Sequence, residues 1–208
     1  GLFTWLYGSD IFYVGQASLQ SFFGIAFWTL FFFIPALTMK QIAEEHKSGT
    51  IEMLLTKPIS EWQVLWGKFL ATLLLIAIAL VLTLPYYFTV WSLGPIDHGA
   101  VWTGYLGLLL MSSAYISIGL FASSLTNNQI VAFLLALFIG IFFHIIFGFL
   151  ASNMSGLVAT VFNYLSLSVH YDSITRGVVD SKDIIYFFSI IFMGIISAEA
   201  ILVKRTLN

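Results

Sequence analysis

Five long apolar stretches constrain the fold of this chain more than any other feature of its sequence. They lie at residues 19–39, 64–84, 101–122, 129–150 and 184–203. Each is about 20 residues long, the length that an α-helix needs to cross the hydrocarbon core of a bilayer. Since 60% of the 208 residues are hydrophobic and only 9% are charged, a soluble fold could not cover its apolar surface. We therefore expect an all-α polytopic membrane protein with one transmembrane domain over residues 1–208.

Residues 1–7, with the sequence GLFTWLY, are apolar but too short to cross a bilayer. We interpret them as the end of a truncated N-terminal span, which would add a sixth helix to the five complete ones. The second stretch continues past residue 84, and Pro85 is expected to end or kink that helix. Between the last two spans, residues 151–183 are expected to form either a re-entrant or interfacial helix or an ordered cap.

Charge predicts which way the chain crosses the membrane. Residues 40–63, residues 123–128 and the C-terminal tail must share one side, and that side carries most of the basic residues: Lys40, Lys47, Lys57, Lys68, Lys204 and Arg205. The other side holds only Arg176 and Lys182. By the positive-inside rule, the loop at residues 40–63 and the C-terminus are cytoplasmic. We expect a multi-pass protein of the bacterial inner (plasma) membrane.

The cytoplasmic loop at residues 40–63 contains several residues that typically begin or end helices. We expect the first span to continue as a helix to Lys47, where Gly49 stops it in the left-handed conformation. A short helix follows at residues 51–56, and Ser60 with Gln63 forms a capping box for the next span. This pattern leaves two interpretations open: a solvated loop, or a docking element for a cytoplasmic partner.

Several segments of the chain form a distinctive sequence pattern. The most specific is AEEHKSGTIEMLLTKP at residues 43–58, followed by Trp62 and GKFLA at residues 67–71. The others are IPALT at residues 34–38, IGLFASSLT at residues 118–126 and HYDSITRGVVD at residues 170–180. With these segments, the chain resembles the permease subunits of ABC-2-type exporters over nearly its whole length, most closely those of gliding-motility systems.

The resemblance implies a coupling helix in the cytoplasmic loop that docks on a separate ATP-binding-cassette ATPase subunit. The residues expected to make these contacts are Glu44, Glu45, Lys47, Thr50 and Glu52. It further implies a second permease subunit, identical or homologous, with ATP and magnesium bound by the ATPase subunits. The family does not fix the cargo.

The sequence gives little support for an enzyme, a metal site or a nucleic-acid-binding protein. The chain has no cysteine, no phosphate loop and no zinc-binding histidine pair, so we expect neither an enzyme nor a metal site. The net charge of −2 offers no basic footprint for nucleic acid. Two alternatives to the exporter stay open: a secondary transporter that uses His144 or Glu199, and a membrane anchor for a cytoplasmic complex that transports nothing.

Three ionisable residues fall inside the apolar stretches, where charge is costly and commonly functional. Lys68 and Glu199 lie near the cytoplasmic ends of their spans, so they either pair across helices or snorkel separately to the interface. His144 lies deeper. It is expected either to hydrogen-bond to a neighbouring helix or to line a translocation path.

Overall fold

The computed structural model describes residues 18–49 and 60–206, and within these residues every regular element is a helix. The elements are α3 (Gln20–Thr38), α4 (Ala43–Ser48), α6 (Glu61–Val81), α7 (Leu84–Leu93), α8 (His98–Leu125), α9 (Gln129–Ile141), the π-helix η1 (Phe142–Ile146), α10 (Phe147–Asn153), α11 (Gly156–Leu165), α12 (Leu167–Thr175) and α13 (Ser181–Thr206). Five helical segments in this part of the chain are long and apolar enough to cross a membrane. The predicted all-α polytopic fold is confirmed.

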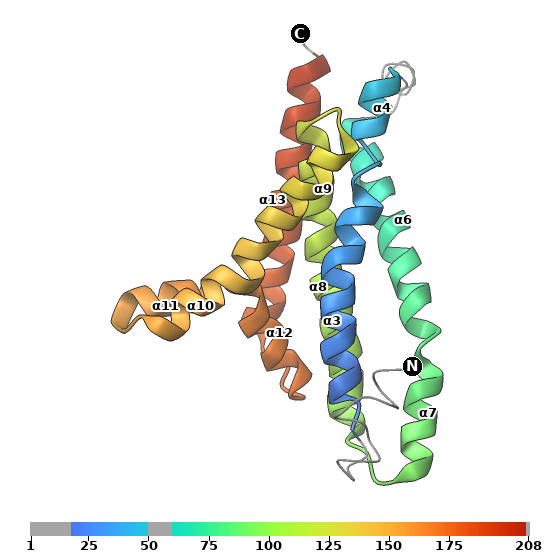
Figure 1. The fold of residues 1–208 in the computed structure, drawn as a ribbon, viewed down its shortest axis with the longest axis vertical. Coiled ribbons are helices and arrows are strands. Elements are labelled where there is room, and N and C mark those ends of the chain that lie inside the picture. Colours follow the sequence, from blue (N-terminus) through green and yellow to red (C-terminus); the bar gives the residue numbers. More distant parts are fainter. Residues whose placement is uncertain (1–17, 50–59, 207–208) are drawn as a thin grey trace.

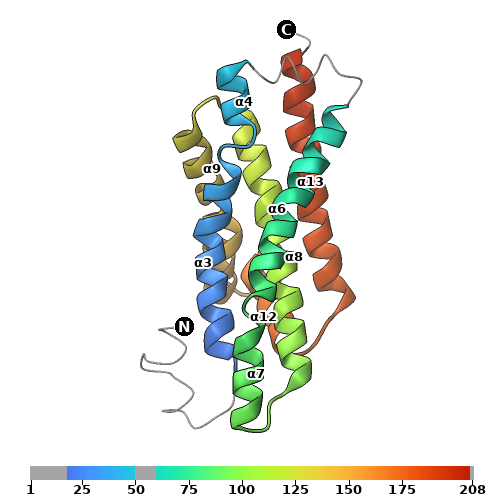
Figure 2. The ribbon, with the colours of Figure 1, turned by 90° about the vertical axis from the view of Figure 1, so that its right-hand side faces the viewer.

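Helix α8 is the centre of the bundle (Figures 1 and 2). It packs against α3, α6, α9, α12 and α13. Its most apolar window is 78% buried, against 22–44% for the other four candidate spans. The four surrounding spans turn exposed apolar side chains outward, among them Leu74 on α6 and Leu134 on α9. A bilayer or another membrane subunit is the environment that such a surface requires.

Small residues allow the helices to approach α8 closely. A Cβ atom added at Gly119 of α8 would lie 2.0 Å from the Thr38 hydroxyl on α3. At Gly194 of α13 it would lie 2.8 Å from the Ser117 hydroxyl on α8. Glycine at such crossings is the usual device by which membrane helices pack in the absence of a hydrophobic driving force between them.

The predicted helix boundaries around the second span are confirmed. Ser60 and Gln63 form the reciprocal capping box at the start of α6. Pro85 occupies the first turn of α7, after a break at residues 82–83 that separates α7 from α6. The missing proline N–H is tolerated there because the first N–H groups of a helix have no partner within it.

The first span differs from its prediction. Helix α3 ends at Thr38, and residues 39–42 form turns before α4 begins at Ala43. The predicted unbroken helix up to Lys47 is therefore wrong, because a side chain of α8 binds the backbone N–H groups of Ile42 and Ala43 at the break. Gly49 does take the predicted left-handed conformation, with φ of 71°. The predicted short helix at residues 51–56 lies outside the described residues.

The bundle has two distinct ends (Figure 1). We call the first the α4 end, because α4, the α8–α9 connection and the C-terminal end of α13 lie together there. The opposite, α12 end contains α7, α12 and the starts of α3 and α8. Helices α10 and α11 form a hairpin that projects sideways from the bundle. The segment at residues 151–183 thus contains two short helices, α11 and α12, where the sequence predicted a re-entrant or interfacial helix or an ordered cap.

Candidate functional site

A single serine of the central helix holds the polar segment at the α4 end. The Ser123 hydroxyl of α8 accepts hydrogen bonds from the backbone N–H groups of Ile42 at 3.1 Å and Ala43 at 3.0 Å. It also donates to the carbonyl oxygen of Met39 at 3.1 Å. Ser123 is fully buried. It satisfies N–H groups that have no partner within a helix, and it thereby fixes the start of α4 to α8.

A lysine of the second span makes the other attachment. The Lys68 ammonium on α6 lies 2.5 Å from the Glu45 carboxylate on α4 and donates to the carbonyl oxygen of Gln41 at 2.6 Å. The Gln41 amide in turn donates to the Thr72 hydroxyl, one turn beyond Lys68 on α6. Only 18% of the Lys68 side chain and 25% of the Glu45 side chain are exposed. The ion pair is therefore partly shielded from water, which strengthens it relative to a surface pair.

The five residues predicted to contact an ATPase divide into three groups in the structure. Glu45 faces inward and pairs with Lys68, so it anchors α4 to the bundle. Glu44 and Lys47 are exposed and thus free to meet a partner. Lys47 lines a groove of about 810 Å³ with the α8–α9 connection, including Thr126 and Asn128. Thr50 and Glu52 lie outside the described residues.

The structure gives Lys68 other partners than Glu199, whose pairing with Lys68 was one of the two alternatives predicted for these residues. Lys68 is bound by Glu45 and Gln41, and no ion pair joins it to Glu199 in the described parts of the chain. Glu199 lies half-buried on α13. The sequence did not identify Glu45 as the partner, because the position of α4 after the break depends on Ser123 of a third helix.

The anchoring residues Gln41, Thr72 and Ser123 were also not predicted. One signal in the sequence pointed to part of this network. Lys68 and Thr72 are four residues apart on α6 and therefore share one face of that helix. Two polar residues on one face within an apolar span indicate a polar partner, although they do not identify it.

His144 lies in a closed aromatic environment. Its Nδ1 is 2.6 Å from the Tyr115 hydroxyl on α8, and only 4% of the residue is exposed. The ring stacks on Phe27 at a centroid distance of 4.1 Å, with Phe31 at 4.8 Å. This is the hydrogen-bonded alternative among the two predicted. The other, a place on a translocation path, stays a prediction, although Phe27 and Phe31 cover part of the imidazole.

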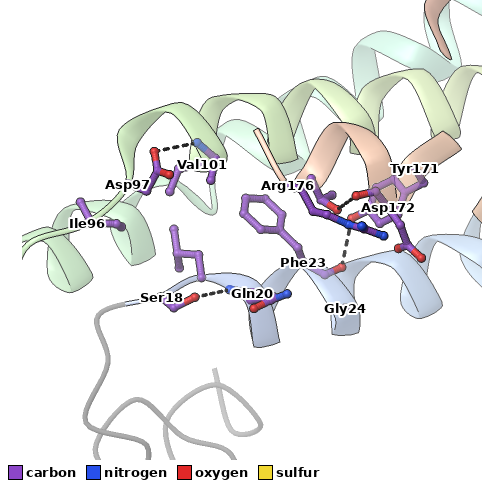
Figure 3. A pocket seen from close by; sticks show the side chains of 13 residues that line it. Ser18, Gln20, Phe23, Gly24, Ile96, Asp97, Val101, Tyr171, Asp172 and Arg176 are labelled. Carbon is purple, nitrogen blue, oxygen red and sulfur yellow. Dashed lines mark hydrogen bonds between the residues drawn. The ribbon is translucent and has the colours of Figure 1, made fainter. Parts of the chain in front are cut away.

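The α12 end contains a pocket of about 530 Å³ between α3, α8 and α12 (Figure 3). Its floor includes the buried rings of Phe23 and Tyr171, and the Tyr171 hydroxyl donates to the Phe23 carbonyl oxygen. Three charged residues line it: Asp97, Asp172 and Arg176. Asp172 keeps an exposed edge, yet burial raises the pKa of its carboxyl group, an effect that the nearby Arg176 charge partly offsets.

No convergent metal site accompanies these clusters. Within residues 18–49 and 60–206, no group of three or more histidine, cysteine, aspartate or glutamate side chains gathers at a point suited to a metal ion. The polar side chains at both ends of the bundle instead bind helix termini and one another. Such contacts fix the positions of the helices relative to one another.

The bundle of five candidate spans, with a polar helix anchored at one end of its central helix, defines a multi-pass membrane protein. The chain belongs to the ABC-2 family of transporter proteins, whose sequence profile matches residues 8–203. The predicted family is confirmed on evidence that covers most of the chain.

Two curated relatives add to this assignment. The chain is 28% identical over 130 residues to the protein described as "Probable multidrug ABC transporter permease YbhR" in Escherichia coli strain K12. It matches the protein of the same description in Escherichia coli O157:H7 to the same extent. The matched stretch covers 62% of this chain and 33% of the length of each relative.

Proposed function

We propose that this chain is the membrane subunit of an ATP-driven ABC exporter and couples ATP hydrolysis by separate ATPase subunits to export of a substrate. The observation that carries the proposal is the double attachment of α4, to α8 through Ser123 and to α6 through Lys68. A displacement of α4 by a cytoplasmic partner would therefore move two spans at once. Glu44 and Lys47, which are exposed on α4, are the described residues proposed to meet that partner.

The partners and location follow from the same proposal. The α4 end is cytoplasmic, in agreement with the excess of lysine and arginine there, and the chain lies in the bacterial inner membrane. Two permease subunits, identical or homologous, assemble with ATPase subunits that bind ATP and magnesium. Involvement in gliding motility stays a prediction from the sequence resemblance. The multidrug description belongs to the relatives.

The two alternative functions receive less support from the contacts. A secondary transporter would need intramembrane groups that meet its coupling ion, whereas His144 is enclosed by aromatic rings and bound to Tyr115. A membrane anchor that transports nothing would use the same α4 surface. It would have no need, however, for attachments that tie α4 to two separate spans.

The test is purification of the full-length protein from its native membrane in a mild detergent, with mass analysis and ATP turnover of whatever co-purifies. We expect a soluble subunit with nucleotide-binding motifs in a stoichiometric amount. Glu44→Ala combined with Lys47→Ala, and separately Glu52→Ala or Thr50→Pro, should release that subunit while the permease still inserts in the membrane. Asp180→Asn, an exposed charge at the α12 end, is the matched control.

The outcomes separate the alternatives. Retention of the ATPase in every one of these variants except the control would contradict the coupling role proposed for this loop. An ATPase that binds through α4 but never responds to any cargo would favour the anchor. Transport that collapses with a protonophore while ATP is still hydrolysed would favour the secondary transporter.

A further inference from the structure

A buried histidine and aspartate join three helices at the α12 end. His170 on α12 places its Nδ1 2.6 Å from Oδ1 of Asp183, in the first turn of α13. Its Nε2 lies 3.1 Å from the carbonyl oxygen of Tyr164, near the end of α11. The side chains of His170 and Asp183 are only 5% and 1% exposed. One imidazole therefore bridges α11, α12 and α13.

The partners of the two ring nitrogens determine how many protons the pair holds. A carbonyl oxygen only accepts hydrogen bonds, so Nε2 of His170 must carry a proton. The 2.6 Å contact between Nδ1 and Oδ1 needs a second proton, held either by the ring or by the carboxyl group. In both arrangements the pair contains two protons and is neutral overall. A histidine with one proton next to an ionised aspartate would lack one of these hydrogen bonds.

We propose that the His170–Asp183 pair is a proton-dependent lock that holds α11 and α12 against α13. While the second proton is present, all three helix ends are joined. When it is lost, the ring keeps a single proton and can donate to only one of its two acceptors, the Asp183 carboxylate or the Tyr164 carbonyl oxygen, so one of the three helix ends is released. The lock is therefore closed at lower pH and loosens as the pH rises. The proposal goes beyond the coupling role of α4 and does not depend on it.

Within the described residues, one oxygen of the Asp183 carboxylate has no hydrogen-bond partner. This oxygen, Oδ2, is buried. An ionised carboxylate in this position would be poorly solvated without the imidazolium. Tyr186 of α13 stacks on the imidazole at 4.0 Å and donates to the Leu165 carbonyl oxygen at 2.6 Å, so it reinforces the same junction.

Other titratable groups on the packed elements already have partners or lie farther along their helices. On α13, Lys182 pairs with Asp180 at 3.1 Å and also interacts electrostatically with Asp183. On η1 and α8, His144 and Tyr115 bind each other. The other titratable residues on the helices around the pair are Tyr164 on α11, Tyr171, Asp172 and Arg176 on α12, and Tyr105 on α8. The contact that changes with the second proton is the one between His170 and Asp183.

A single introduced thiol can report the state of the lock, because the chain has no cysteine of its own. Ser166, between α11 and α12, is fully buried, so a Ser166→Cys variant should react slowly with a water-soluble maleimide while the lock is closed. The labelling rate is measured in lipid nanodiscs between about pH 5 and 8, where histidine ordinarily titrates. Division by the rate for Ser92→Cys, an exposed position on α7, removes the intrinsic increase in thiolate with pH.

We expect this ratio of rates to rise with pH by up to about tenfold per pH unit, the limit for one linked proton. Two variants should then move it in opposite directions. With Asp183→Asn, the side-chain amide can donate to the unprotonated Nδ1, so labelling of Ser166→Cys should stay slow at every pH. With His170→Gln, the bridge is lost, and labelling should be fast at every pH.

The control variant is His98→Gln. His98 is exposed and bonds through Nδ1 to the Tyr87 hydroxyl, away from the lock, so the native pH dependence should persist. A ratio that does not change with pH in the otherwise unaltered protein would overturn the proposal. Fast labelling in a folded Asp183→Asn variant would overturn it too, because a proton-dependent lock gives slow labelling there.

Discussion

Lys68 and Glu45 form an ion pair with a separation of 2.5 Å that ties α4 to the second span, although 23 residues separate them along the chain. Because both side chains are partly buried, truncation of one partner leaves the other poorly solvated. We expect Lys68→Met to lower the free energy of unfolding by about 1–3 kcal/mol. Thermal unfolding of the protein in detergent would measure it.

Charge exchange identifies the partner of Lys68 directly. Lys68→Glu combined with Glu45→Lys should recover part of the stability that Lys68→Glu loses. Lys68→Glu combined with Glu199→Lys should recover none, since the structure does not pair these two residues. Recovery in the second double variant alone would show that the predicted pair across α6 and α13 forms after all.

Removal of the Ser123 hydroxyl tests the attachment of α4 to α8. In Ser123→Ala the backbone N–H groups of Ile42 and Ala43 lose their acceptor, at a cost of about 1–3 kcal/mol for an unsatisfied buried group. Ser124→Ala is the matched control, because the Ser124 hydroxyl is also buried but, among the described residues, bonds to the Phe121 carbonyl oxygen of its own helix and to no other helix. Equal losses in both variants would contradict a special role for Ser123. In the assembled transporter, Ser123→Ala should also weaken the stimulation of ATP turnover by cargo.

The crossing of α3 and α8 should not tolerate a methyl group. Gly119→Ala would place Cβ 2.0 Å from the Thr38 hydroxyl oxygen and 2.7 Å from its Cβ, so the two helices must separate. Overpacking of this kind costs about 1–3 kcal/mol or more. Gly67→Ala on α6 meets nothing within 4 Å and should be neutral or stabilising by up to about 1 kcal/mol. Unfolding midpoints that rank the two variants in the reverse order would disprove the close crossing.

His144 and Tyr115 should behave as one structural unit. Tyr115→Phe and His144→Phe each remove one partner of a buried hydrogen bond, and each should cost about 1–3 kcal/mol. The double variant should cost less than the sum of the two, because the second substitution has no bond left to break. Strict additivity in this double-mutant cycle would mean that the two side chains do not interact.

Arg176 should influence the titration of Asp172 in the pocket at the α12 end. Burial raises the pKa of the Asp172 carboxyl in the folded protein, so its contribution to stability is present below the unfolded value and is lost as the pH rises through the folded value. Arg176→Gln removes a charge that opposes this shift, so the loss of stability with rising pH should become larger. Asp172→Asn should abolish it, as followed by the unfolding midpoint from about pH 4 to 7.

The sequence by itself determined that the chain is a helical membrane protein and where its spans lie. Length and apolar composition decide this, since a backbone in lipid must satisfy its hydrogen bonds within a helix. Local signals were equally sufficient for the capping box at Ser60, the break before Pro85 and the conformation of Gly49. Each depends only on residues within one or two turns.

Only the tertiary structure decided the partners of the polar residues. Glu45 instead of Glu199 meets Lys68 because α3 ends at Thr38, and that end is stabilised by Ser123, which lies far along the chain on α8. Likewise, His170 was not singled out as a site from the sequence, because its two partners come from α11 and α13. Hydrogen bonds and ion pairs act over a few ångströms, so their identity follows from how the helices pack.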